Sequence, residues 1–308
     1  MKKKFTLLCV SFSLVTAAFA QTGTISGKVI NSVSYEPLPF ATVFINHTTI
    51  GTAADGNGDF VLKNIPFGQH ELAVMFVGHN TFQMKVNVKD TVARSLTIKL
   101  NSKPLQEIQV SSNQDKKWRK QYERFEKLFL GNSAYADRCK ILNPWVLDFG
   151  KSDDGFFVAT ANDVLEIENH SLGYKLFYML EKFSYGSTQY QIGGTVRFEE
   201  LKASDTTTIH SWIANRQQVY TGSERHLFKS IIEGMVREEG FNLYRDETGS
   251  KDVIRLAKFE WNFGDDFMAY APGNLVFEEM GPNKFKLPLP RRLEVHFLKK
   301  KQLNTLYK

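Results

Sequence analysis

The sequence predicts a mainly β protein, in which a seven-stranded β-sandwich is followed by a helix and an α+β C-terminal domain. Between residues 23 and 101, short apolar runs alternate with polar residues, and turn residues recur at about every ten positions. This pattern is typical of strands that bury one face between two sheets. Residues 116–130 then repeat apolar side chains at helical spacing, and residues 141–308 combine alternating runs with one strong helical pattern.

The first twenty residues have the three parts of a secretory signal peptide. Lys2, Lys3 and Lys4 form the charged start, residues 5–19 are apolar, and residues 18–20 form a small-residue cleavage site of the A-x-A type. The apolar stretch is short for a membrane span, which needs ~20 residues. We therefore expect an exported protein whose mature chain begins at residue 21 and contains no transmembrane segment.

The composition indicates a globular chain without disulfides. Of its 308 residues, 42% are hydrophobic, which suits two domains of ordinary size. Removing residues 1–20 takes away three lysines and no acid, so the formal charge falls from +6 to +3. Only Cys139 then remains, which excludes an intrachain disulfide, and we interpret it as a small buried apolar residue. Export and the lack of a binding motif exclude nucleic acid from the expected partners.

The sandwich is predicted from alternating runs at residues 25–29, 41–45, 60–62, 72–76, 82–88 and 96–100. Two glycines in residues 55–58 allow positive φ at a tight hairpin, and Pro66 with Gly68 makes a corner. Residues 55–66 could instead be read as a calcium loop. That loop needs Gly at its sixth position and Glu at its twelfth, where this chain has Phe60 and Pro66, so the turn is the better interpretation.

Five segments of this region resemble one family in order and spacing: residues 23–29 (GTISGKV), 36–43 (EPLPFATV), 51–60 (GTAADGNGDF), 65–68 (IPFG) and 77–79 (VGH). They resemble the carboxypeptidase regulatory-like domain. The resemblance implies a transthyretin-like β-sandwich that is an accessory or docking module without catalytic residues. Such modules occur beside metallocarboxypeptidases and at the N-terminus of TonB-dependent receptors in Gram-negative envelopes. The resemblance therefore implies the periplasm, or association with the outer membrane or the cell surface.

A joining segment follows the sandwich at residues 102–140. We expect a short linker strand at residues 103–110 and then a basic amphipathic helix at residues 116–130, ended by Gly131. Its basic side chains could meet anionic lipid or glycan. The other interpretation is a solvated face over an aromatic stripe, which the interleaved acids favour.

The remaining residues, 141–308, are expected to form an α+β domain with an antiparallel sheet and one packed helix. The expected elements are a hairpin of residues 156–161 and 164–168, strands at 172–185, 190–198, 241–244, 253–263, 275–277 and 293–298, and a helix at 223–239. Residues 118–149 and 215–240 resemble the C-terminal part of an uncharacterised family of envelope proteins with the same first module. That resemblance implies no activity.

The sequence contains no recognisable catalytic motif. The His-x-x-Glu pair of zinc carboxypeptidases, the His-Glu-x-x-His motif, the Gly-x-Ser-x-Gly elbow and the phosphate loop are all missing. We therefore expect no catalytic residue, cofactor or metal. The candidate binding residues precede or open the predicted helix, whose N-terminus could face an anion, and they are His210, Trp212, Arg216, Tyr220 and His226. We expect His210 and Trp212 on one extended face and Arg216 and Tyr220 in a loop.

These observations favour a non-catalytic exported envelope protein. The sandwich would present a C-terminal domain that binds a protein or a glycan, with an outer-membrane protein or a cell-surface glycan as the partner. One alternative is a glycan- or peptide-active hydrolase whose site is built from scattered carboxylates in residues 141–308. Another is a component of a TonB-dependent outer-membrane uptake system.

Overall fold

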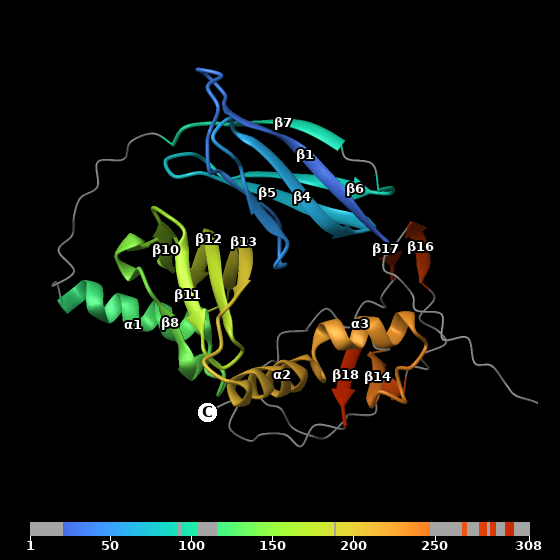
Figure 1. Cartoon of the computed structure of the whole chain (residues 1–308). Helices are drawn as coiled ribbons and strands as arrows, with labels where there is room; N and C mark the ends of the chain where they lie inside the picture. Colours follow the sequence, from blue (N-terminus) through green and yellow to red (C-terminus); the bar gives the residue numbers. More distant parts are fainter. Residues whose placement is uncertain are drawn as a thin grey trace, which may run out of the picture.

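The chain forms two lobes, a β-sandwich and a larger mixed region (Figure 1). The computed structural model describes residues 21–91, 94–103, 116–187, 189–246, 267–269, 277–281, 284–287 and 293–298. The predicted signal peptide, most of the linker strand at 103–110, the strand at 253–263 and most of that at 275–277 lie outside the described residues.

The first lobe is a sandwich of two sheets that enclose one apolar core. The first sheet has the order β4 (Asp59–Pro66), β1 (Thr22–Asn31), β7 (Arg94–Leu100). The second has the order β3 (Gly51–Ala53), β2 (Thr42–Ile45), β5 (Gly68–Met75), β6 (Phe82–Val88). All neighbours are antiparallel except β1 and β7. The predicted seven-stranded sandwich is confirmed, because alternate side chains from both sheets meet in one buried cluster.

The turn at residues 55–58 is held by its own aspartate. The Asp55 carboxylate accepts hydrogen bonds from the backbone N–H groups of Asn57 at 2.8 Å and Asp59 at 2.9 Å. Gly58 has φ +76°, and a Cβ there would come 2.6 Å from the Val29 carbonyl oxygen. The turn interpretation is therefore confirmed.

The second lobe contains a six-stranded antiparallel sheet built around one long strand. On one path the order is β8 (Cys139–Ile141), β11 (Leu165–Asn169), β12 (Tyr174–Tyr185), β10 (Phe157–Ala161), β9 (Leu147–Lys151), and β13 (Tyr190–Glu200) pairs with β12 along its other edge. Two short 3-10 helices, η1 (Ala136–Arg138) and η2 (Pro144–Val146), flank β8. The long strands predicted at 172–185 and 190–198 are confirmed.

The predicted hairpin of residues 156–161 and 164–168 is wrong, although both strands exist. β10 pairs with β9 and with the end of β12, whereas β11 pairs with β8 and the beginning of β12. The tight turn instead joins β9 to β10, where Gly155 takes φ +78°. Asn162, which was expected in the hairpin turn, donates to the Val146 carbonyl and to Asp148.

The predicted helix at 116–130 is confirmed as α1 (Lys116–Leu130), and it is part of the core rather than a spacer. Phe125 is completely buried against the sheet. Trp118 stacks on Tyr122 and donates from Nε1 to the Leu147 carbonyl at 3.1 Å. Gly131, at φ +81°, ends the helix.

Two further helices follow, and they differ from the expectation. Residues expected to be extended or in a loop form α2 (Thr206–Tyr220), which Asp205 caps by accepting from the Thr208 N–H at 2.8 Å. The helix predicted at 223–239 is α3 (Glu224–Ile232), capped by Ser223, so its predicted end is wrong. Gly234 at φ +70° stops it about two turns early and leaves Met235 exposed.

The helix α3 covers a small sheet at the end of the described chain. This sheet has the order β15 (Phe267–Ala269), β14 (Phe241–Asp246), β18 (Leu293–Phe297), and β16 (Glu278–Gly281) forms a separate hairpin with β17 (Lys284–Lys286). The strands predicted at 241–244 and 293–298 are confirmed. Leu227 and Ile231 of α3 pack with Phe241 and Leu243 of β14 in a core of their own.

The outer face of the second sandwich sheet packs on the six-stranded sheet. Along β2, Val43 and Ile45 point into the sandwich core, whereas Phe44 points outward and is completely buried with Met75 and Met179. Along β12, Tyr178 and Leu180 belong to the core under α1, and Met179 between them faces the sandwich. The six-stranded sheet therefore lies between the sandwich on one face and α1 on the other.

Hydrogen bonds tie the β2–β3 loop to the free edge of β13. The backbone N–H of His47 donates to the Val196 carbonyl at 2.9 Å, and the backbone N–H of Phe198 donates to the Thr48 carbonyl at 3.0 Å. The Asn46 amide oxygen accepts from the Val196 N–H at 2.9 Å, and the Asn46 amide nitrogen donates to Glu71 at 2.6 Å. Because Asn46 is buried and both ends of its amide are paired, the contact has a defined geometry.

Candidate functional site

The five candidate residues lie on α2 and α3, but they do not form one site. Trp212 and Arg216 face the turn between β11 and β12. Tyr220 and His226 are in ring contact with each other at 5.0 Å. His210 is exposed on α2 and lines neither group.

Trp212 and Arg216 hold α2 on the turn at residues 170–173. The Trp212 Nε1 donates to the His170 carbonyl at 3.0 Å, and the indole covers Gly173, where a Cβ would come 2.2 Å from the ring. One turn later, Arg216 donates from Nε to the Leu172 carbonyl at 2.8 Å. These contacts satisfy turn carbonyls that no strand partner reaches, which is a structural role.

The Arg216 guanidinium has little capacity left for a ligand. In addition to the turn carbonyls, it donates to Glu200 at 2.9 Å and lies 3.9 Å from the centre of the Tyr174 ring. An anion would have to displace Glu200 to gain a bidentate contact. We therefore place Arg216 in the packing of α2 on the sheet.

His226 is buried at the start of α3 and both of its ring nitrogens have partners. The Gly222 N–H donates to Nδ1 at 3.0 Å, so the proton sits on Nε2, which donates to Glu239 at 3.1 Å. The ring also contacts Phe241 and Phe297. Gly222 is at φ +79° with Phe297 against it, a position that a side chain could not take.

A polar cavity of about 240 Å³ opens beside His226. Most of its wall is made of hydrogen-bonding side chains from the end of α2, from α3 and from the segment before β14. They are Gln217, Tyr220, Thr221, His226, Lys229, Ser230, Glu233 and Glu239, with Phe297 as the apolar member. We call this the α3 cavity.

The α3 cavity lacks the arrangement that hydrolysis needs. Neither nitrogen of His226 is free to take a proton from a nucleophile. The Ser230 hydroxyl donates to the His226 carbonyl at 2.7 Å, which directs it along the helix. Lys229 is paired with Glu233. The wall therefore offers donors and acceptors for a neutral polar ligand rather than a nucleophile and base.

Two other expectations concern reactive groups. Cys139 is half-buried, its Sγ contacts the Tyr135 carbonyl, and burial raises the pKa of its thiol. A raised pKa lowers the thiolate fraction at neutral pH, so this thiol is not activated.

Within the ranges that the structure describes, no three His, Cys, Asp or Glu side chains are placed to hold a metal ion. Nor is any helix in those ranges long and apolar enough to cross a bilayer.

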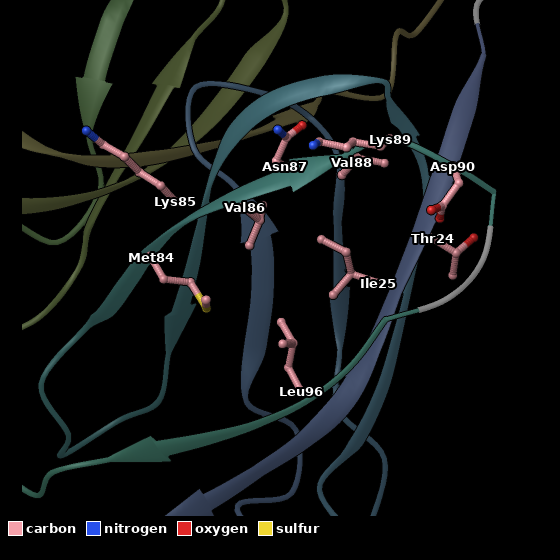
Figure 2. A pocket seen from close by; sticks show the side chains of 10 residues that line it. All are labelled: Thr24, Ile25, Met84, Lys85, Val86, Asn87, Val88, Lys89, Asp90 and Leu96. Atoms are coloured by element: carbon pink, nitrogen blue, oxygen red, sulfur yellow. The ribbon is translucent and has the colours of Figure 1, made fainter. Parts of the chain in front are cut away.

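A second cavity, of about 280 Å³, lies at the open side of the sandwich, where β6 and β7 are not paired with each other (Figure 2). Met84, Val86, Ile25 and Leu96 point into it, whereas Lys85 points away. Its inner wall is continuous with the sandwich core. We interpret it as the incompletely closed edge of that core.

Of the nine residues that line the α3 cavity, sequence reasoning found only Tyr220 and His226, and it missed Gln217, Lys229 and Glu239 among the others. Gln217 lies one turn before Tyr220 and shares its face only if residues 206–220 are helical. The sequence signal for that helix was Asp205, a residue type favoured at helix N-caps, whose carboxylate accepts from the Thr208 N–H in the structure. The segment after Asp205 has only a weak apolar period.

Comparison with known proteins identifies the first lobe. Residues 25–110 match the family model of the CarboxypepD_reg-like domain, and the C-terminal part has no family assignment. No curated protein matches the chain.

Solved structures resemble the chain only distantly. A type II cohesin–X-dockerin complex from Acetivibrio cellulolyticus is 24% identical over 25% of this chain and 56% of that one, so this chain spans little more than half of it, with a TM-score of 0.22. A proposed carbohydrate-binding protein from Bacteroides uniformis is 10% identical over 59% of this chain and 75% of that one, also with a TM-score of 0.22. A proposed membrane-associated protein of unknown function from Bacteroides fragilis is 12% identical over 63% and 76%, with a TM-score of 0.22. Scores this low support no conclusion on function.

Proposed function

We propose that this chain, whose residues 25–110 form a CarboxypepD_reg-like domain, is a non-catalytic exported envelope protein that binds a glycan through its C-terminal region. The sandwich is an accessory module in this proposal, and it holds the six-stranded sheet in place. The protein works in the periplasm, or attached to the outer membrane or the cell surface.

The α3 cavity is the observation that carries the proposal. Sugars present many hydroxyl groups, and each can donate and accept hydrogen bonds. The cavity wall provides amide, hydroxyl, ammonium and carboxylate groups at short range, with Tyr220 and Phe297 as apolar surfaces. Binding sites of this kind combine a few convergent polar groups with aromatic rings.

The same geometry argues against the hydrolase alternative at this cavity. A glycosidase needs two carboxyl groups on opposite sides of the scissile bond. Of the two acids here, Glu239 is bonded to the His226 ring and Glu233 to Lys229. Each carboxylate therefore already has a fixed partner on the protein.

Binding is tested by titrating the chain from residue 21 onward with soluble oligosaccharides from envelope polysaccharides, using calorimetry. Gln217→Ala and Lys229→Ala each remove a wall donor without touching the buried His226. Loss of one hydrogen bond to a ligand weakens binding by about tenfold. Lys202→Ala, an exposed change before α2, is the matched control and leaves the affinity unchanged.

Two results contradict the proposal. One is the absence of oligosaccharide binding across the set. The other is binding whose affinity is the same in the native protein and in both cavity variants, because the ligand would then sit elsewhere.

A further inference from the structure

The outward side of α1 carries a concentration of positive charge. Its basic residues there are exposed, and α1 lies on the face of the six-stranded sheet opposite to the sandwich. Lys116, Lys120 and Lys127 are four and seven residues apart and stand opposite to the buried Phe125. With Arg119 beside them, we call these four residues the basic face.

The acids in the helix do not neutralise the basic face. Glu126 accepts a hydrogen bond from the Tyr122 hydroxyl at 2.5 Å, and Tyr122 packs on the core. Burial, and then the neighbouring Glu126, raise the pKa of Tyr122. Only Glu123 shares the outward stripe. Within the described part of the chain, none of the ion pairs involves Lys116, Lys120 or Lys127.

Helix stability does not explain the basic residues of the first turn, although Lys127 in the last turn is favourable for the helix. The first turn of α1 contains no acid, and it carries Lys116, Lys117 and Arg119. A helix N-terminus already has a partial positive charge, so bases there are unfavourable for the helix itself. Arg124 differs from the basic face, because it lies over the Phe157 ring at 4.6 Å and so contributes to packing.

An exposed tryptophan lies near the first turn of α1. Trp145 in η2 is 63% exposed. It stands two residues before Leu147, whose carbonyl accepts the Trp118 N–H at 3.1 Å. Basic side chains together with an exposed indole are the combination found where proteins meet the headgroup region of a membrane.

We propose that the basic face and Trp145 dock the protein on an anionic lipid bilayer. The core under α1 fixes the helix, so the lysines are presented in a rigid row to the lipid phosphates. The sandwich lies on the other face of the sheet and would point away from the lipid. This docking surface is separate from the α3 cavity, and it stands whether or not that cavity binds a glycan.

The test is co-sedimentation of the full chain, lacking only residues 1–20, with phosphatidylcholine vesicles that contain or lack phosphatidylglycerol. We expect binding only to the anionic vesicles, and release at ~1 M salt, where charges are screened beyond ~3 Å. The variant Lys116→Gln/Lys120→Gln/Lys127→Gln should bind about 100-fold more weakly, since each lysine near such a surface contributes about fivefold. Glu123→Gln should bind about fivefold more tightly.

The matched control removes three exposed lysines from the sandwich, in Lys63→Gln/Lys85→Gln/Lys89→Gln, and should bind like the native chain. A blue shift of tryptophan fluorescence on anionic vesicles should disappear in Trp145→Phe. The proposal is overturned if the anionic vesicles bind no protein, or if the two triple variants bind equally. An unchanged affinity in Glu123→Gln would also overturn it, because that change adds to the outward charge without touching the core.

Discussion

The sandwich and the region around α3 reach a folded state with very different cores. The sandwich encloses fifteen buried hydrophobic residues between two sheets, and the core under α3 has five among the described residues. The core under α3 has fewer apolar side chains, and it also contains buried polar groups, since His226 and Ser230 are both enclosed and hydrogen-bonded. The apolar side chains of the sandwich core, including those that point into the cavity at its open edge, offer no hydrogen bonds to a polar ligand, whereas the small polar core leaves a wall of donors and acceptors. The comparison therefore supports the proposal that a ligand binds near α3 and that the sandwich is a supporting module.

The largest expected effect is in the sandwich core. Phe60→Ala removes a ring that is 3% exposed and should lower the free energy of unfolding by about 3–5 kcal/mol. Urea unfolding followed by hydrogen exchange of sandwich peptides measures this loss. The neighbouring Val61 points outward and is 48% exposed, so Val61→Ala should change stability by less than about 0.5 kcal/mol. Equal effects of the two changes would contradict the assignment of the two faces of β4.

The contact between the lobes should come next. Phe44→Ala opens a cavity beside Met75 and Met179, and should cost about 2–4 kcal/mol because an interface can partly close. Residues 21–103 contain no tryptophan, so tryptophan fluorescence does not report the unfolding of the sandwich. We expect the fluorescence transition in urea to separate from the circular dichroism transition of the sandwich. Transitions that stay coincident would show that Phe44 does not couple the lobes.

The polar core under α3 should be sensitive to its histidine. His226→Ala leaves Glu239 and the Gly222 N–H without their partners and should cost about 1–3 kcal/mol. The exposed His210 on the neighbouring helix is the control, and His210→Ala should be neutral within about 0.5 kcal/mol. Thermal unfolding of both variants provides the comparison. If His226→Ala left the stability unchanged, the buried polar groups would not stabilise the core under α3.

The packing of α2 should respond more weakly. Arg216→Lys keeps the charge but loses the fork that reaches the Leu172 carbonyl and Glu200 together, and should cost about 1 kcal/mol. Chemical denaturation of the two proteins measures the difference. Ala214→Lys adds a charge at an exposed position on the same helix and serves as the comparison for a general charge effect.

The smallest expected effect is a pH dependence at the start of α2. The Thr208 N–H, then the Ser204 and Thr208 hydroxyls, donate to Asp205 and lower its pKa below 3.8. Because the pKa of Asp205 is lower in the folded state than in the unfolded state, its charge stabilises the folded state at pH values above 3.8. This stabilisation is lost as the pH falls through the folded pKa. Asp205→Asn keeps an acceptor without the charge, so it should flatten the acid side of the stability curve. An unchanged curve would mean that the cap does not form.

The residues that were easy to predict differ physically from those that were not. The sandwich strands alternate over most of their length, as at residues 59–62 of β4, and glycine supplies the positive φ at Gly58 and Gly78, so pattern and turn chemistry largely agree. In α2, Ile209 and Ile213 are exposed while Trp212 and Arg216 face the sheet, so no apolar stripe marks the helix. Its packing uses hydrogen bonds to turn carbonyls, which leave no period in the sequence.

The α3 cavity could be predicted only in part for a similar reason. Tyr220 and His226 were singled out because they precede or open the predicted helix, whose N-terminus could face an anion. Glu239 reaches His226 only because Gly234 ends α3 early and the chain turns back toward β14. Contacts that depend on where a helix stops are set by a single backbone conformation and not by periodicity.

The most direct test of the account is amide hydrogen exchange at the outer edge of β13, read residue by residue by NMR. The Val196 and Phe198 amides point away from β12 and donate to Asn46 and Thr48 of the sandwich. If the sandwich is clamped to the sheet, these two amides should be protected like the Arg197 amide between them, which points to β12. Asn46→Ala should remove the protection of Val196 first. Fast exchange of Val196 and Phe198 in the native protein, with Arg197 still protected, would contradict the account.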